Sequence, residues 1–167
     1  NHVDADLYSK PLEWSGRTLG RFMRFFGPIS SCFDILTFAY LFFVLCPSVC
    51  GGAFSALAGS AEQARFIALF QTGWFLESMW TQVLILHLLR TQKVPLLQSR
   101  PSRPVMLVTL LGTALFTLLT FTPIGELIGL TALPPVYFVF LALTVLLYLL
   151  WVTLAKRWYL WRHHELL

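Results

Sequence analysis

Four long apolar runs, separated by polar segments, dominate the chain. A helix that crosses a lipid bilayer needs roughly 20 consecutive residues that are mostly apolar. The runs of that length are 25–46, 66–89, 104–122 and 136–155. They predict an all-α fold, an integral membrane segment of four helices. The remaining segments are predicted to lie outside the hydrocarbon core: 1–24, 47–65, 90–103, 123–135 and 156–167.

The composition supports a membrane protein rather than a soluble domain. Of the 167 residues, 57% are hydrophobic and only 12% are charged, and the mean hydropathy is +0.71. A soluble domain carries about 25% charged residues, which it needs to cover its surface. The opening residues are polar and contain no apolar stretch typical of a signal peptide. The chain is therefore expected to be a piece of a longer polypeptide.

The positive charges predict how the four helices are oriented. Of the 12 Lys and Arg residues, 11 lie in 1–24, 90–103 and 156–167, and the other is Arg65. Because Lys and Arg accumulate in cytoplasmic loops, both termini and 90–103 are expected in the cytoplasm. The loops 47–65 and 123–135 are then expected to face outward. This asymmetry also explains the pI of about 9.2, so the expected partners of the basic clusters are anionic lipid headgroups and not nucleic acid.

Aromatic residues gather near the ends of the fourth run, where amphipathic rings are expected to lie at the membrane–water interface. These residues are Tyr137, Trp151, Trp158, Tyr159 and Trp161.

Glu77 stands near the middle of the second run. Helical spacing places Gly73 and Thr81 on its face, a combination suited to close packing against other helices. Counting from Phe66, Glu77 lies roughly 16 Å along the helix axis, which is about mid-bilayer. An unpaired carboxylate there costs on the order of 3 kcal/mol, so an intramembrane acid usually marks an ion path. Glu77 is therefore a candidate for a cation path, the alternative being a protonated carboxyl that bonds a neighbouring helix.

The first run carries a second acid, Asp34, within a polar patch. Ser30, Ser31 and Thr37 share its side of the helix by the same spacing. Hydroxyl groups can satisfy a buried acid without a metal. The residues expected to have a structural polar role are therefore Asp34, Ser30, Ser31 and Thr81. No catalytic or cofactor-binding residue is predicted.

Three cysteines leave an alternative open. Cys46 and Cys50 lie at the outward end of the first run. Four spans with a pair of cysteines on the outer side are the arrangement expected of a membrane thiol oxidoreductase. Such an enzyme needs a second pair to relay electrons, and only Cys32 remains. A further alternative is a purely structural bundle with no ligand of its own.

Two stretches carry a resemblance to a known family. They are "GRFMRFFGPISSCFDILTF" and "FQTGWFLESMWTQVLILHLLRTQKVPLLQSRPSRPV". They resemble the C-terminal membrane region of bacterial magnesium-translocating P-type ATPases, and the resemblance runs from about residue 1 to about residue 160. The second stretch is the more specific, because it combines W-F-x-E-S, T-Q, H-x-x-R-T and Q-S-R.

The resemblance implies that the four helices are the seventh to tenth spans of a pump in the bacterial inner membrane. The complete protein would import Mg²⁺ at the expense of ATP, through an aspartyl-phosphate formed on domains outside this chain. This chain would not be catalytic alone, and its partners would be the other membrane and cytoplasmic domains of the same pump. By this resemblance, Glu77 falls where related calcium pumps place an ion-binding glutamate. Asp34 matches an acid of the seventh span, and its expected role is mainly structural.

Overall fold

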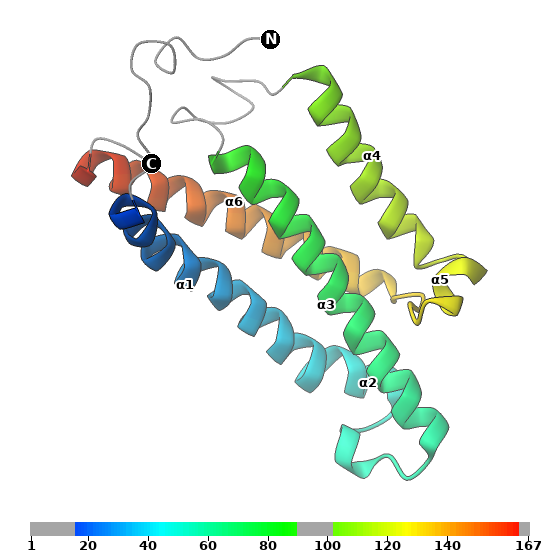
Figure 1. Ribbon diagram of the computed structural model, residues 1–167. Helices are drawn as coiled ribbons and strands as arrows, with labels where there is room; N and C mark the ends of the chain where they lie inside the picture. Colours follow the sequence, from blue (N-terminus) through cyan, green and yellow to red (C-terminus); the bar gives the residue numbers. More distant parts are fainter. Residues whose placement is uncertain (1–15, 90–101, 164–167) are drawn as a thin grey trace.

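The computed structural model describes residues 16–89 and 102–163, and these segments are entirely helical or connecting turns (Figure 1). The all-α expectation is therefore confirmed for them. The elements in chain order are α1 (Gly16–Tyr40), the π-helix η2 (Leu41–Leu45), α2 (Cys46–Cys50), the 3-10 helix η3 (Phe54–Ala56), α3 (Ser60–Leu89), α4 (Arg103–Leu119), α5 (Pro123–Leu127) and α6 (Pro135–His163).

Two of these helical segments are long and apolar enough to cross a membrane, Leu19–Ala56 and Pro135–Arg162. The 17-residue α4 is a shorter apolar helix. The 30 residues of α3 would extend roughly 45 Å at 1.5 Å per residue. Helices α1, α3 and α6 all continue beyond the predicted runs, so part of each extends into the segments that were expected to be loops.

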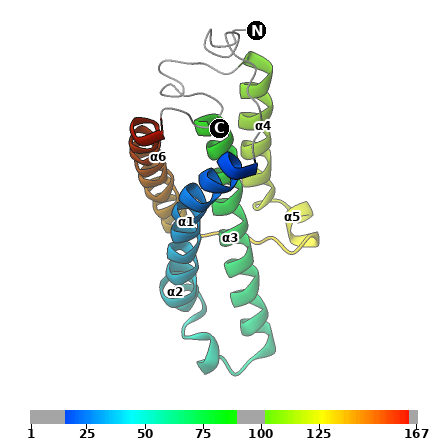
Figure 2. The ribbon, with the colours of Figure 1, turned by 60° about the vertical axis from the view of Figure 1, so that its left-hand side comes forward.

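Helix α3 is the centre of the fold. It packs against α1 and α6 on one side and against α4 on another (Figures 1 and 2). One apolar cluster lies around Leu41, Leu76 and Tyr137, and a second lies around Leu88 and Tyr159. Helices α1 and α3 run in opposite directions, whereas α3 and α6 run in the same direction (Figure 1).

A proline explains the π-helix that follows α1. Pro47 has no N–H, and its ring clashes with the carbonyl four residues earlier in a regular α-helix. Widening the preceding turn relieves that clash, and the Cys46 N–H donates to the Leu41 carbonyl, five residues back. Gly51 ends α2 at φ 83°, in the left-handed region that favours glycine.

Two of the aromatic residues of α6 are packed inside the bundle. Tyr137 is 0% exposed and Tyr159 is 2% exposed, because both rings lie between helices. The three tryptophans of α6 are exposed. Tyr137, Tyr148 and Tyr159 are 11 residues apart, which is close to three helical turns, so all three share one face.

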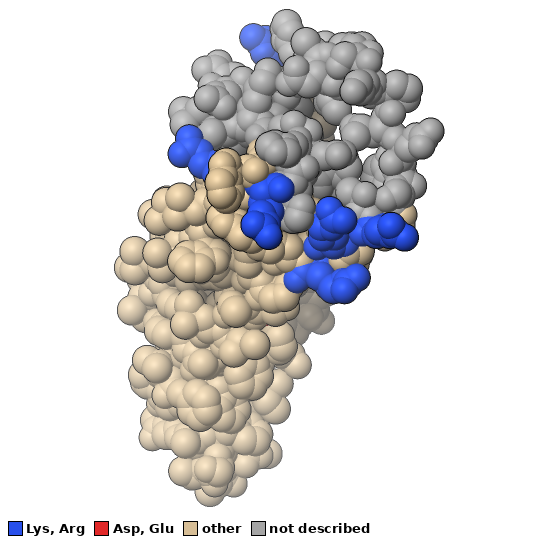
Figure 3. All heavy atoms as spheres, turned by 90° about the vertical axis from the view of Figure 1, so that its left-hand side faces the viewer, with Lys and Arg blue, Asp and Glu red and all other residues tan. Residues whose placement is uncertain are grey.

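Positive charges gather at one end of the described structure. Figure 3 shows Lys and Arg at the end next to the residues drawn in grey, and no charged residue over the rest of that view. The start of α1, the start of α4 and the end of α6 all point toward this end (Figure 1). Arg65 lies near the start of α3, at the opposite end. Lys156 is buried at the basic end and donates to the Leu88 carbonyl at 2.7 Å.

Candidate functional site in the α1–α3–α6 interior

Glu77 lies in the interior of the bundle. Its side chain is 0% exposed, and both carboxylate oxygens are buried without a hydrogen-bond partner among the described residues. Gly73, Thr81 and Leu88 are buried on the same face of α3, as their helical spacing predicted. This face therefore turns toward α1 and α6, and it carries an acid into an apolar interior.

Gly73 allows the three helices to approach one another one turn before Glu77. A Cβ at this position would lie 2.7 Å from Leu41 Cδ2 and 3.3 Å from Tyr137 Cε2. The Tyr137 hydroxyl donates a hydrogen bond to the Gly73 carbonyl. A small residue at a helix contact and a polar bond between helices are the two features that hold membrane helices together.

Two further hydroxyls lie buried near Glu77 without a hydrogen-bond partner in the described part of the chain. They are Thr37 Oγ1 on α1 and the hydroxyl of Tyr148 on α6. Thr37 precedes Leu41 by one turn and Glu77 follows Gly73 by one turn. Because α1 and α3 are antiparallel and Leu41 meets Gly73, Thr37 lies level with Glu77. Three helices thus contribute buried polar oxygens that have no partner.

Asp34 belongs to the same region. Its side chain is half-buried, and it is close enough to act electrostatically on Glu77. Ser30 is half-buried next to Tyr148, whose ring also meets Phe33 edge-on at a centroid distance of 5.2 Å. The two acids of the chain's apolar runs therefore influence one another electrostatically across the α1–α3 contact.

The other two predicted residues take different positions. Thr81 is buried, but its hydroxyl donates within its own helix, to the Glu77 carbonyl at 3.0 Å and the Ser78 carbonyl at 3.1 Å. Ser31 is exposed on the outside of α1 and so does not join the polar interior. Sequence reasoning missed the roles of Tyr137 and Tyr148, although their 11-residue spacing was a usable signal.

The buried carboxylates and hydroxyls around Glu77 allow only a limited kind of metal binding. Among residues 16–89 and 102–163, no three His, Cys, Asp or Glu side chains are grouped closely enough to hold a metal ion. Mg²⁺ takes six oxygen ligands and keeps several of its waters. Glu77 and Asp34 could supply two carboxylates to a partly hydrated ion, with hydroxyls beside them, but could not enclose a bare one.

The cysteines do not form a bonded pair. Cys46 is buried, Cys50 is half-buried, and both are free thiols one helical turn apart in α2. Cys32 is exposed on α1 and is also free.

Comparison with known proteins decides the family. The family model described as "Cation transporting ATPase, C-terminus" matches residues 2–158. The chain belongs to this family. Its relatives include a protein named "Magnesium-transporting ATPase, P-type 1" from Salmonella typhimurium (strain LT2), which is 40% identical over 96% of this chain. A protein of the same name from Escherichia coli (strain K12) is 37% identical over 95% of this chain.

The resemblance inferred from the sequence is thus confirmed at the level of the cation-transporting ATPase family. The chain spans 16% of the length of each of these two relatives. Membership of the family also argues against the thiol-oxidoreductase alternative, because it accounts for the four apolar runs without a redox role for Cys46 and Cys50.

Proposed function

We propose that this chain is the C-terminal membrane region of a P-type ATPase that imports Mg²⁺. The observation that carries the proposal is 40% identity over 96% of the chain to a magnesium-transporting relative. ATP would be used by domains that lie outside this chain, and Mg²⁺ would be the transported substrate. The partners of the chain are then the other membrane and cytoplasmic domains of the same pump, in the inner membrane of a bacterium.

The proposed topology has four spans, at 25–46, 66–89, 104–122 and 136–155. Both termini and 90–103 lie in the cytoplasm, where the basic clusters also meet anionic headgroups. Two facts support this arrangement. The described cations other than Arg65 lie at one end of the structure, and positive residues accumulate on the cytoplasmic side of membrane proteins.

Within that pump, Glu77 is proposed to border the cation path. Support comes from its two unpartnered oxygens, from Asp34 nearby, and from the unpartnered hydroxyls of Thr37 and Tyr148. A buried charge without a partner is costly, so a cation, water or a proton must accompany it for part of the transport cycle. The path would be formed jointly with membrane helices of the pump that lie outside this chain.

Uptake of Mg²⁺ tests the proposed function. Expression of the full-length pump in a bacterial strain without its own Mg²⁺ uptake systems should restore growth at low external Mg²⁺. A pump whose phosphorylated aspartate is replaced by asparagine is the control, and it should not restore growth. If the intact pump gives no more Mg²⁺ uptake than the control, the assignment of Mg²⁺ import is wrong.

A further inference from the structure

Four large apolar side chains are exposed on the turn that joins α4 to α6. They are Phe121 (52% exposed), Ile124 (62%), Leu127 (86%) and Ile128 (61%). The last three lie within about 100° of one another around the short helix α5, and Glu126 is turned about 150° away from them. We call the four apolar residues the α5 apolar face. An exposed apolar patch of this kind marks a surface that contacts a membrane or another protein.

The turn holds this face in a fixed orientation. Thr122 caps the start of α5, because its hydroxyl accepts a hydrogen bond from the Gly125 N–H at 3.3 Å. A Cβ at Gly125 would clash with the Leu119 carbonyl, so only glycine lets the chain fold back this tightly. Gly129, at φ 84°, ends the helix, and the N–H groups of Gly129 and Leu130 donate to carbonyls of α5. These backbone groups are paired within the turn, which lowers the cost of lying next to lipid.

A hydrogen bond to α3 sets the depth of the turn. The Thr131 N–H donates to the buried Thr72 hydroxyl at 3.0 Å. From Leu88, which bonds Lys156 at the basic end, α3 rises roughly 24 Å to Thr72. The hydrocarbon core of a bilayer is about 30 Å thick. With the basic end at the cytoplasmic boundary, as the proposed topology has it, the turn lies at or just inside the outer boundary of this core.

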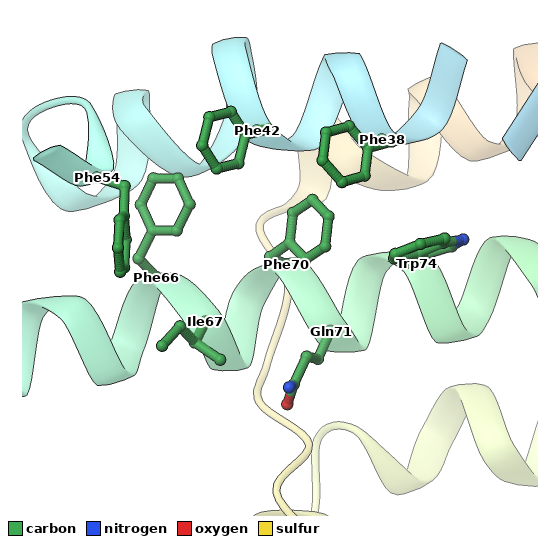
Figure 4. Close-up of a pocket in the computed structure, with 8 residues that line it drawn as sticks. All are labelled: Phe38, Phe42, Phe54, Phe66, Ile67, Phe70, Gln71 and Trp74. Atoms are coloured by element: carbon green, nitrogen blue, oxygen red, sulfur yellow. The ribbon is translucent and has the colours of Figure 1, made fainter. Parts of the chain in front are cut away.

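The other outer connection, between α2 and α3, reaches much farther. Helix α3 continues from Thr72 back to Ser60, roughly 18 Å beyond the turn. Figure 2 shows α2 and the start of α3 well beyond α5. Along part of this length α3 borders an aromatic groove of about 310 Å³, in which Phe66 faces Phe42 and Phe54 (Figure 4). The outward end of the structure is therefore the α2–α3 connection, whereas the α5 turn stops at the level of the membrane.

The α5 apolar face also continues the apolar surfaces of the two helices that it joins. Leu118 near the end of α4 and Val136 at the start of α6 border the turn, and both are exposed. Other exposed apolar side chains follow along α4 and α6, among them Leu111, Leu115 and Val139. In the proposed spans these side chains lie at the depth of the acyl chains. The α5 apolar face is thus an extension of a surface suited to lipid.

From its orientation, depth and continuity with α4 and α6, we infer that the α5 apolar face is an anchor that enters the outer leaflet of the membrane. Its partner is the boundary between the headgroups and the acyl chains of the outer phospholipids. The inference rests on the proposed function, since it takes the basic end to be cytoplasmic. The anchor would fix the depth of α4 and α6 from the outer side, as the basic residues do from the cytoplasmic side.

Spin-label depth measurements on the full-length pump test the anchor. In a pump without other cysteines, Leu127→Cys carries the nitroxide, and the pump is placed in vesicles of phosphatidylethanolamine and phosphatidylglycerol. Oxygen concentrates among acyl chains and a nickel chelate stays in water, so the rates at which they collide with the label give its depth. We expect a depth of about 5–10 Å inside the headgroup region, as for an amphipathic helix in the membrane plane.

Three further positions serve as controls. Glu126→Cys, on the opposite side of the same turn, should give a shallower label. Ser55→Cys, exposed in the longer outer connection, should collide mainly with the nickel chelate. Leu146→Cys, at a position 62% exposed on α6, should collide mainly with oxygen.

Three results would overturn the inference. A Leu127 label that meets the nickel chelate as freely as the Ser55 label would place the face in water. A label that meets neither reagent would mean that protein covers the face, and magnetic coupling between labels would mean that a second copy does. Oxygen at Leu146 together with nickel at Leu127 would remove the anchor but leave the proposed spans intact. The measured depths do not depend on which ion the pump carries, so Mg²⁺ uptake tests the proposed function separately.

Discussion

Replacing Glu77 with alanine is expected to lower Mg²⁺ transport by the full-length pump at least about tenfold, which corresponds to ~1.4 kcal/mol. The carboxylate lies in the interior with both oxygens unpartnered, so its charge is the property that a passing cation would use. Glu77→Gln keeps the size and the hydrogen-bonding ability but removes the charge. It should therefore reduce transport about as much as Glu77→Ala does, as measured by Mg²⁺ uptake at matched protein levels.

Thr81→Val is the control for this experiment. Thr81 lies one turn away on the same buried face, and its hydroxyl bonds only carbonyls of its own helix. Transport close to that of the unchanged pump is expected for this variant. If Glu77→Gln transported Mg²⁺ normally, the residue would be a neutral hydrogen-bonding group between helices, and the ion-path proposal would fail.

The second large effect is expected for a substitution of Gly73, and it concerns the stability of the folded pump rather than transport. Gly73→Leu should destabilise the packing of α3 on α1 and α6, because even its Cβ would lie 2.7 Å from Leu41 Cδ2. Overfilling a packed interior typically costs about 1–3 kcal/mol. Thermal unfolding of the purified pump should therefore begin several degrees lower, in proportion to that loss. Gly73→Ala should have a smaller effect, since the closest atom is the end of a flexible side chain.

Gly112 offers a matched control on α4. A Cβ there meets no atom within 4 Å, so Gly112→Leu should leave the unfolding temperature nearly unchanged. The close approach of the helices at Gly73 would be contradicted if the two leucine variants unfolded at the same temperature.

Local patterns in the sequence predicted the helices and one of their faces. Gly73, Glu77 and Thr81 are buried together on α3 because residues three and four apart share a helical face, which requires no knowledge of the neighbours. The identity of the neighbours was not predictable in that way. Tyr137 reaches the Gly73 carbonyl from 64 positions along the chain, a contact that depends on how α6 packs.

The contacts and exposures that the sequence does not predict have physical causes of the same kind. The sequence does not reveal that Tyr137, at the end of an apolar run, packs its ring beside Gly73 in the interior. Ser31 was grouped with Asp34 by rotation about α1, yet it lies on the exposed edge of that group. The widened turn before Pro47 shifts the residues after Tyr40 by one position around the helix, which a regular helical count cannot include.

The proposal that underlies the account is that this chain crosses the membrane four times as the closing part of a cation pump. Single cysteines at Ser55 and at Lys93, in a full-length pump without other cysteines, test it with a membrane-impermeant thiol reagent. Ser55 should react in intact cells, and Lys93 should react only after the membrane is opened. Reaction of Ser55 from the cytoplasmic side alone, or of both positions from the same side, would contradict the proposed topology.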